Sequence, residues 1–467
     1  MNYTDFLKSK QIMSAASGFE CSEFNPKLFG WQHDVVRWAL KKGKCALFEE
    51  CGLGKTAQQL EFAYKVQRYT ELPVLILAPL AVAKQTAERE GIKFGYEVNI
   101  CRNQTDVING INITNYEMVE HFDPDAFGGI VLDESSILKS YTSKTKQYLV
   151  DAFRDTPFKL CCTATPSPND FTELGNHAEF LGVMSRSEML ATFFVHDGGS
   201  TQDWRLKGHA KESFFAWVAS WACCLTSPSD LGYDGSAYRL PELTIHEHVV
   251  KSGRLEDPDG QLRIFASSVL SLPERRQARK CSTRARAQVV AELVNSTDEQ
   301  CLVWCDYNDE SAISTELIEG AVEVKGSDPN VYKADSMIAF SDGRVKCLVS
   351  KPKIAGWGMN WQNCHNVIFN GLSDSFEAYY QAIRRCWRFG QKQPVNVHII
   401  ISDAEGAVKD NIEKKQADAV LMTKELVKYT KDILTSEIRQ TNRVTDRYSA
   451  DKKVSMPRWI GGKQWSA

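Results

Sequence analysis

A glycine-rich stretch carries the residue types best suited to phosphate chemistry. Gly52-Leu53-Gly54-Lys55-Thr56 follows the apolar residues 45–48 and precedes a helix-compatible segment. Glycines let backbone N–H groups approach phosphate oxygens, and the N-terminus of a helix favours an anion. We expect Lys55 to reach the β- and γ-phosphates of ATP and the Thr56 hydroxyl to ligate Mg²⁺. The stretch therefore predicts a phosphate-binding loop.

Two acids at the end of another apolar segment strengthen this interpretation. Residues 129–134 place Asp133 and Glu134 at the C-terminal end of a predicted strand. An acid in that place can hold Mg²⁺, and its neighbour can orient or deprotonate an attacking water. Taken alone, each motif has an ordinary alternative: solvated carboxylates for the acids, and a tight turn for the glycines, because Glu49 stands where the strict loop pattern has glycine. Together they favour nucleotide hydrolysis.

Two arginines near residue 385 complete the set of charged groups. Arg385 and Arg388 are three residues apart on a predicted helix, so they would share one face. Two cations on a second domain suit a γ-phosphate held across a cleft. A solvated basic helix face is the alternative.

Short apolar runs alternate with helix-compatible segments, which is typical of an α/β fold with parallel sheets. Strands are predicted at residues 45–48, 74–79, 98–101, 111–114, 129–134 and 159–165, and again at 301–305, 321–326, 345–350, 366–371 and 395–402. Between these groups the chain is rich in Trp, Phe and Ser, and residues 217–225 are predicted to form a buried helix. We expect an ATP-binding domain at 1–181, a helical insertion at 182–241, a second sheet domain at 242–410 and a helical C-terminal extension at 411–467.

Composition narrows the class of protein. The 467 residues carry a net charge of −3 and 43% hydrophobic residues, so a nucleic-acid surface would have to be a local patch. The fourteen cysteines contain no Cys-x-x-Cys pair, which favours buried reduced thiols over a zinc site. No signal peptide or apolar run of spanning length is apparent, and we expect a cytoplasmic monomer without membrane contact.

One basic segment stands out against the acidic balance. Residues 273–288 concentrate arginines and lysines, among them Arg275, Arg276, Arg279 and Lys280. On a helix many of these side chains would share a face suited to phosphates. The alternative is a solvated helix end.

The order of these motifs resembles that of superfamily 2 helicases, and within them the Snf2-like (SWI2/SNF2) branch. Residues 29–40, 77–90 and 113–117 resemble the adenine-reading segment and motifs Ia and Ib, while 163–170, 301–309 and 350–362 resemble motifs III, IV and V. The segment 381–391, QAIRRCWRFGQ, resembles motif VI. Three residues depart from the family pattern: Ser136 replaces His, Ala164 replaces Gly, and Arg384 stands where the family often has Asp.

The resemblance implies two tandem RecA-like domains that close on ATP and Mg²⁺. Catalytic roles would fall to Lys55, Asp133, Glu134, Arg385 and Arg388, with Thr56 and Asp133 at the metal. Nucleotide contacts would come from Gln32, Gly52, Leu53, Gly54, Lys55, Thr56, Gly358 and Gln381. Nucleic-acid contacts would come from the basic segment and also from Pro79, Lys84, Thr114, Lys139, Lys351, Lys353 and Trp357. Coupling between the ATP site and the nucleic-acid site would come from Thr163, Thr165 and Asn169.

Three functions follow from the resemblance. The first is an ATP-dependent translocase on duplex DNA, of the compact kind that bacteriophages often encode and that would then act in the host cytoplasm. The second is a helicase that separates strands at forked or branched DNA. The third is an ATP-gated DNA-binding module with little turnover, favoured only by Ser136 and Ala164. Protein partners, the direction of movement and the process served stay open.

Overall fold

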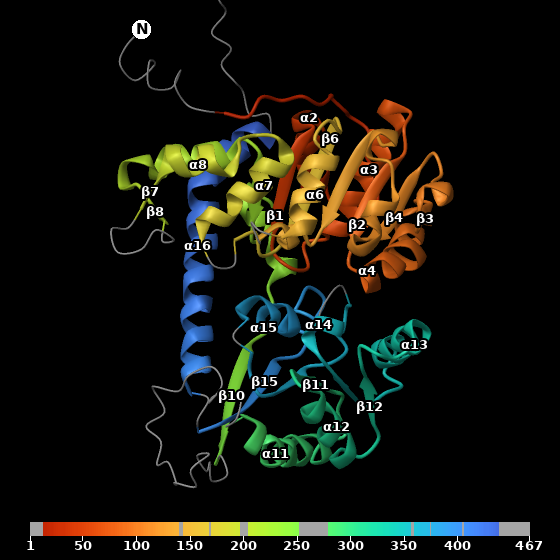
Figure 1. Ribbon diagram of the computed structural model, residues 1–467, viewed down its shortest axis with the longest axis vertical. Coiled ribbons are helices and arrows are strands. Elements are labelled where there is room, and N and C mark those ends of the chain that lie inside the picture. Colours follow the sequence, from red (N-terminus) through yellow and green to blue (C-terminus); the bar gives the residue numbers. More distant parts are fainter. Residues whose placement is uncertain are drawn as a thin grey trace, which may run out of the picture.

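The computed structural model describes residues 13–139, 143–167, 170–196, 204–251, 279–355, 359–373, 375–403 and 406–438. Its described part contains two large parallel sheets, one in each half of the chain, and a small antiparallel hairpin. The two sheet domains stand one above the other in Figure 1, and a long C-terminal helix runs beside both.

The first sheet has seven parallel strands in the order β3-β4-β2-β5-β6-β1-β9. Their bounds are β1 Lys44–Glu49, β2 Val74–Ala78, β3 Val98–Ile100, β4 Ile111–Asn115, β5 Gly129–Asp133, β6 Phe158–Thr163 and β9 Ala222–Leu225. The six strands predicted in this half all form, each within two residues of its predicted ends.

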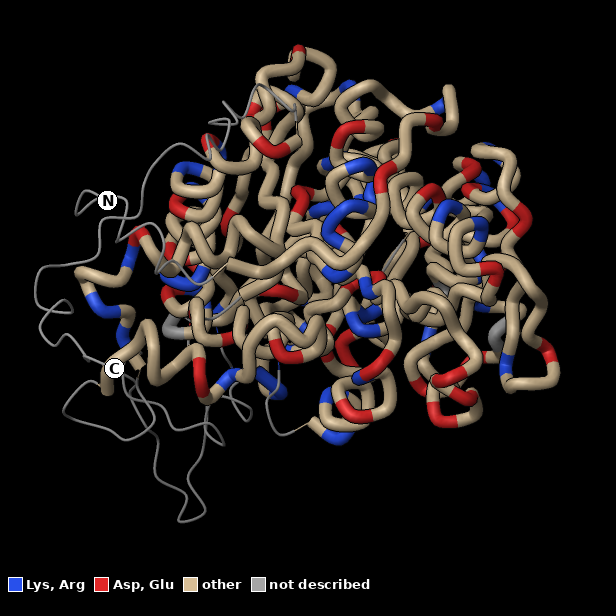
Figure 2. The backbone as a smooth tube through the Cα atoms, turned by 90° about the horizontal axis from the view of Figure 1, so that it is seen from above, with Lys and Arg blue, Asp and Glu red and all other residues tan. Residues whose placement is uncertain are grey.

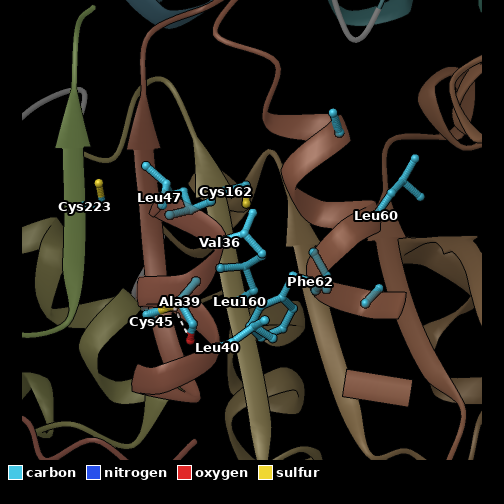
Figure 3. Close-up of a cluster of buried hydrophobic side chains, with 14 of the residues drawn as sticks. Val36, Ala39, Leu40, Cys45, Leu47, Leu60, Phe62, Leu160, Cys162 and Cys223 are labelled. Atoms are coloured by element: carbon cyan, nitrogen blue, oxygen red, sulfur yellow. Dashed lines mark hydrogen bonds between the residues drawn. The ribbon is translucent and has the colours of Figure 1, made fainter. Parts of the chain in front are cut away.

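Helices cover both faces of this sheet because side chains alternate along a strand. In β1, Cys45 and Leu47 belong to the cluster that also holds α2 (Gly30–Lys42) and α3 (Lys55–Thr70). Figure 3 shows this cluster, with Val36, Leu60 and Phe62 pointing at the strands. The other face packs against α6 (Lys144–Ala152), α7 (Leu174–Leu181) and α9 (Lys211–Ala219).

The second sheet has six parallel strands in the order β10-β15-β14-β11-β13-β12. Their bounds are β10 Leu243–Val250, β11 Cys301–Cys305, β12 Ala321–Val324, β13 Cys347–Ser350, β14 Asn366–Asn370 and β15 Val395–Ser402. The helices of this half are α11 (Thr283–Asn295), α12 (Asn308–Leu317), α13 (Asn330–Ser341), α14 (Pro352–Ala355) and α15 (Phe376–Ile383). Residues in β11 alternate between two clusters, so this sheet is also covered on both faces.

The remaining helical elements lie between strands or in the segment that joins the two sheets. They are α4 (Leu80–Gln85), a π-helical turn (Thr86–Gly91), α5 (Ile92–Phe94), α8 (Arg186–Phe193) and eight short helical turns among the described residues, beside the hairpin β7 (Phe194–His196) and β8 (Trp204–Leu206). The described turns are 3-10 helices at 104–106, 116–121, 124–126, 135–139, 171–173, 208–210, 228–231 and 236–238.

The prediction of one buried helix over residues 217–225 is wrong. Helix α9 ends at Ala219, and Ala222–Leu225 forms β9, which pairs in parallel with β1. Every residue of β9 is buried, so an apolar run of this length satisfies either element, and only the open edge beside β1 selects a strand. The segment between the two sheets therefore contributes a strand to the first sheet.

Helix α16 (Gly406–Ile438) begins at the second domain and ends on the first (Figure 1). Its buried Leu434 and Ile438 join the cluster beneath α2, and Phe215 stacks on its Tyr429 with ring centroids 4.9 Å apart. Glu437 accepts a hydrogen bond from Trp38 Nε1 at 3.0 Å and pairs with Lys42 at 2.9 Å. The C-terminal helix thus adds to the core of the N-terminal domain.

Surface charge and cysteine placement agree with the composition. Lys and Arg positions are interspersed with Asp and Glu positions along the backbone (Figure 2). All the cysteines are free thiols, and all but Cys21, Cys51 and Cys281 are buried. Among the described residues, no helix is long and apolar enough to cross a membrane.

Candidate active site

Three predicted motifs meet because β5, β6 and β1 are neighbours in one parallel sheet. The carboxyl ends of parallel strands lie along the same edge, which is where ligands of open α/β sheets bind. The loop after β1 carries the glycine-rich stretch, β5 ends at Asp133, and β6 ends at Thr163. The topology therefore gathers residues that are far apart in the sequence.

The glycine-rich loop has the backbone shape that its glycines permit. Gly52 and Gly54 adopt φ of 90° and 81°, a region that side chains disfavour, and α3 begins at Lys55. A Cβ on Gly54 would lie 2.6 Å from Gln32 Nε2. Lys55 Nζ donates to the carbonyl oxygens of Glu49 at 2.7 Å and Glu50 at 3.2 Å. The ammonium group therefore lies inside the loop, where a phosphate would meet it.

Gln32, predicted to contact the adenine base, braces this loop. Its Nε2 donates to Leu53 O at 2.9 Å, and its Oε1 accepts from Phe29 N at 3.0 Å. Glu49, where the strict pattern has glycine, is fully buried and accepts from Gln58 Nε2 at 2.8 Å. Burial raises the pKa of Glu49 to about 7, against the opposing effects of Lys55 and Gln58. Glu49 is thus a structural part of the loop.

Asp133 contacts helix α3, and one of its carboxylate oxygens accepts hydrogen bonds. Gln59 Nε2 donates to Asp133 Oδ1 at 2.7 Å, and Glu134 N donates to the same oxygen at 3.2 Å. Thr56 is half-buried at the start of α3. Carboxylate and hydroxyl oxygens are the donors that Mg²⁺ prefers, so Thr56 and Asp133 fit the predicted ion.

Glu134 combines backbone strain, burial and an unpartnered oxygen. Its φ of 53° is rare for a residue other than glycine, and such outliers cluster at functional sites. Its buried Oε2 has no hydrogen-bond partner among the described residues. Burial, followed by the adjacent Asp133 charge, raises the pKa of Glu134 to about 7, against the opposing effects of Lys55 and Arg385. A carboxylate with a pKa near neutrality is suited to accept a proton from water.

Arg385 and Arg388 do not lie on a helix, contrary to the prediction. Helix α15 ends at Ile383, and the carbonyl oxygen of Arg385 accepts from Trp361 N at 2.9 Å instead of continuing the helix. The two guanidinium groups still converge, because each donates to Met359 O at 3.2 Å. The Arg385 charge acts on both Asp133 and Glu134, so the second domain brings a cation to the acids of the first.

The positive charges of Arg385 and Arg388 are buried close to each other, so they repel each other and are poorly solvated. Burial first, and then the neighbouring Arg385 and Arg384 charges, lower the pKa of Arg388 to about 10. Gln381, predicted to contact the nucleotide, orients Arg385: its Oε1 accepts from Arg385 Nη2 at 2.6 Å. A polyanion in this cleft would relieve the repulsion between the arginines.

The motif III residues connect the two domains. Thr165 N donates to Thr163 Oγ1 at 3.1 Å, and Thr165 Oγ1 donates to Glu377 Oε1 of α15 at 3.4 Å. Lys139, predicted to contact nucleic acid, pairs with the same Glu377. Asn169, Trp357 and Gly358 lie outside the described residues.

A groove of about 920 Å³ opens between the domains beside these residues. Helix α4 lines one side and α13 the other, and they face each other in Figure 1. Five predicted nucleic-acid contacts line it: Pro79, Lys84, Thr114, Lys139 and Lys353. Glu134 lines it as well, so the groove reaches the candidate hydrolytic centre.

Sequence reasoning missed part of this lining. Arg89, Arg102 and Lys333 were not predicted, whereas Lys353 was. Arg102 could have been found, because it follows β3 at the same edge of the sheet that carries the other motifs. Lys333 on α13 has no sequence signal of its own. Lys351 is described but does not line the groove.

Arg279 and Arg286, two described arginines of the basic segment, do not face outward as a phosphate-binding surface would require. Arg279 is buried and donates to both carboxylate oxygens of Glu310, at 2.7 and 3.0 Å, while Arg286 donates to Glu310 at 2.8 Å. Both arginines therefore form internal ion pairs of the second domain, since a buried charge requires a partner. Lys280 is exposed, and Arg275 and Arg276 lie outside the described residues.

Two family models match the chain. The SNF2-related domain matches residues 31–193, within the first sheet domain, and the Helicase conserved C-terminal domain matches residues 285–390, within the second. The predicted fold class, two tandem RecA-like parallel-sheet domains, is thereby confirmed.

Several known proteins are similar to this chain. A Mus musculus protein, the DNA annealing helicase and endonuclease ZRANB3, is 27% identical over 429 residues, which cover 81% of this chain and 39% of that protein. The Putative protein p41 of Acyrthosiphon pisum secondary endosymbiont phage 1 is 28% identical over 183 residues, covering 34% of this chain and 39% of that protein. The chain thus spans about two fifths of the length of each of these relatives. Among solved structures, the Sulfolobus solfataricus SWI2/SNF2 ATPase core in complex with dsDNA is similar with a TM-score of 0.41 and 19% identity, covering 91% of this chain and 99% of that one.

Proposed function

Because the chain belongs to the Snf2-like branch of superfamily 2, whose members are nucleic-acid-dependent ATPases and helicases, we propose that it is an ATP-driven translocase on duplex DNA. In this proposal ATP binds between the two sheet domains, and DNA binds in the adjoining groove. The protein acts as a monomer, with residues 1–181 and 242–410 as the two moving domains and α16 as part of the C-terminal extension.

One observation carries the proposal: Arg385 and Arg388 converge on Met359 O, and the adjoining Arg384 contacts Glu50 of the loop that carries Lys55. Cations from two domains around one pair of acids suit a nucleotide triphosphate whose hydrolysis changes how the domains dock. The strained backbone of Glu134 and its unpartnered buried Oε2 favour turnover over binding alone.

The proposed reaction uses the residues of the cleft in separate roles. Lys55 and the loop N–H groups hold the β- and γ-phosphates. Thr56 and Asp133 would hold Mg²⁺, which would neutralise phosphate charge. Glu134 accepts a proton from the attacking water, and Arg385 and Arg388 stabilise the charge that develops on the transferred phosphate. Loss of that phosphate removes the anion that holds the arginines, so the domains move apart.

The groove supports DNA as the substrate that is moved. Its lining has six basic side chains, which are Lys84, Arg89, Arg102, Lys139, Lys333 and Lys353. The four acidic side chains in the lining are Glu88, Glu117, Glu134 and Glu377. Basic side chains on both domains would bind backbone phosphates on each side of the cleft. A movement of one domain relative to the other would then shift its phosphate contacts along the DNA.

The test is ATP hydrolysis without nucleic acid and with single-stranded DNA, duplex DNA or RNA. We expect duplex DNA to stimulate most, and Arg385→Ala to lower the stimulated kcat by about a thousandfold. Displacement of a third strand from a triplex then tests movement. Arg344→Glu is the matched control, because that exposed arginine pairs only with nearby Asp342 among the described residues. The proposal would be refuted if the rate of ATP hydrolysis were the same with and without nucleic acid, or if Arg385→Ala left the stimulated rate unchanged.

A helicase acting on forked or branched DNA is the second candidate. The observation that favours it is the similarity to a mouse protein named as a DNA annealing helicase. Stimulation by forks well above linear duplex, with strand separation or annealing measured directly by fluorescence, would select it over the translocase.

A further inference from the structure

An ion pair crosses the cleft beside the phosphate-binding loop. Arg384 Nη2 of the second domain lies 2.5 Å from Glu50 Oε1, in the segment between β1 and the glycines. Tyr380 of α15 donates its hydroxyl to the same oxygen. The Arg384 side chain is 4% exposed and that of Glu50 is 26% exposed, so the pair is largely shielded from solvent.

The second domain holds Arg384 in place from several sides. Its Nη1 donates to Trp387 O at 3.1 Å, and its Nε donates to Tyr380 Oη at 3.3 Å. Its guanidinium lies over the Trp387 ring at 4.8 Å and over the Tyr380 ring at 5.4 Å. These contacts fix the direction of the side chain, so little rotamer freedom is lost when Glu50 docks on it.

Glu50 is ionised when it meets this cation. Burial would raise the pKa of the Glu50 carboxyl, but the Arg384 charge and the hydrogen bonds from Tyr380, Arg384 and Cys51 N outweigh it. The pKa of Glu50 therefore lies below its ordinary value, and the pair is charged at neutral pH.

The pair joins the two segments that carry the phosphate-handling groups. Glu50 offers its carbonyl oxygen to Lys55 at 3.2 Å, and Arg384 immediately precedes Arg385. A second close contact lies beside the pair, because a Cβ on Gly52 would lie 2.9 Å from Phe389 Cβ. An aspartate in place of Arg384 would face the Glu50 carboxylate and repel it.

The geometry points to a positioning role for this pair: Glu50 and Arg384 set the docking of the second domain so that Arg385 and Arg388 face the phosphates. The inference rests on the proposed function and deepens it, since it assigns the contact that closes the hydrolytic site. Neither side chain needs to touch ATP for this role.

The experiment compares Glu50→Arg, Arg384→Glu and the double variant that carries both changes. Each single variant places like charges in contact, and we expect kcat at saturating ATP to fall by about tenfold, with a smaller change in KM. The double variant restores an attractive pair and should recover kcat to within about threefold of the unmodified chain. Arg344→Glu again controls for the change in net charge.

A second measurement reports docking without activity. Dyes on unnatural amino acids at the exposed positions Ile92 and Glu319 report the distance between the domains by energy transfer. We expect the single variants to lower the transfer and the double variant to restore it. Unchanged kcat and transfer in both single variants would overturn the inference, as would a double variant no better than the worse single one. Absence of ATP hydrolysis in the unmodified chain would instead refute the proposed function, while the transfer measurement would still test the pair.

Discussion

Removal of the Glu310 carboxylate should destabilise the second sheet domain, because the arginines around it are buried ion-pair partners and not surface contacts for nucleic acid. Glu310 is fully buried between Arg279 and Arg286, which donate to it at 2.7 to 3.0 Å. Its Oε2 also accepts the backbone N–H groups of Asp306 and Tyr307, both at 3.0 Å. Glu310→Ala would leave two buried guanidinium groups and two partly buried N–H groups without this partner.

The magnitude follows from these contacts. Breaking a buried ion pair by removing one partner costs about 3–5 kcal/mol, and the unsatisfied N–H groups add to that cost. With a urea dependence of about 2–3 kcal/mol per molar for a domain of this size, the unfolding midpoint should fall by at least about 1 M. Arg279→Ala should act in the same direction.

The assay is equilibrium urea unfolding followed by tryptophan fluorescence, with Trp304 and Trp361 buried in this domain as reporters. The exposed neighbour Lys280 supplies the control, because Lys280→Ala should leave the free energy of unfolding unchanged within about 0.5 kcal/mol. Although burial alone would raise it, Arg279 and Arg286 hold the pKa of Glu310 below its ordinary value. The stabilisation is therefore complete above the unfolded pKa of about 4.3 and is lost as pH falls through the lower folded pKa.

The reasoning would be refuted if Arg279→Ala weakened DNA binding while leaving the urea midpoint unchanged. That result would restore the interpretation of Arg279 as a phosphate contact. A fallen midpoint in both the Arg279 and Glu310 variants, with Lys280→Ala unaffected, would support the buried network.

Three further predictions concern Glu134, Glu377 and Leu434. Since burial and the Asp133 charge raise the pKa of Glu134 to about 7, the measured pH profile of kcat/KM for ATP should rise through that pH. Glu134→Gln should abolish the DNA-stimulated hydrolysis. Glu377→Gln should tighten duplex DNA binding severalfold in fluorescence anisotropy, because it removes a negative charge from the groove and releases Lys139; weaker binding would contradict this. Leu434→Ala should cost the first domain about 2–5 kcal/mol in urea unfolding, because Leu434 is fully buried, whereas the 58% exposed Leu421 of the same helix should tolerate alanine.

Features that depend on neighbouring residues in the chain were predictable from the sequence, whereas features that depend on contacts between distant segments were not. The strands of the first sheet, the glycine-rich loop and the acids that end β5 were predictable, because local patterns of apolar residues and glycines encode them. The convergence of Asp133 and Thr163 was predictable as well, since parallel strands end at one edge. Strand β9 was not, because a fully buried apolar run is compatible with either a helix or a strand, and the open edge of β1 decides.

Charge was the property that the sequence described least well. A run of arginines looks the same whether its side chains meet phosphates or a buried carboxylate, and Glu310 lies 31 residues from Arg279 along the chain. The pairs Glu50–Arg384 and Lys139–Glu377 are separated further still, and they form only when two domains dock.

The sequence by itself determined which residues can cradle a phosphate and in what order the motifs occur, because those requirements are local in the chain. The tertiary structure alone decided which basic side chains face the cleft, which form buried ion pairs inside a domain, and which acids contact Arg384 and Lys139. The physical reason is that burial and electrostatic partnership depend on distances between elements, which the spacing of residues along the chain does not specify.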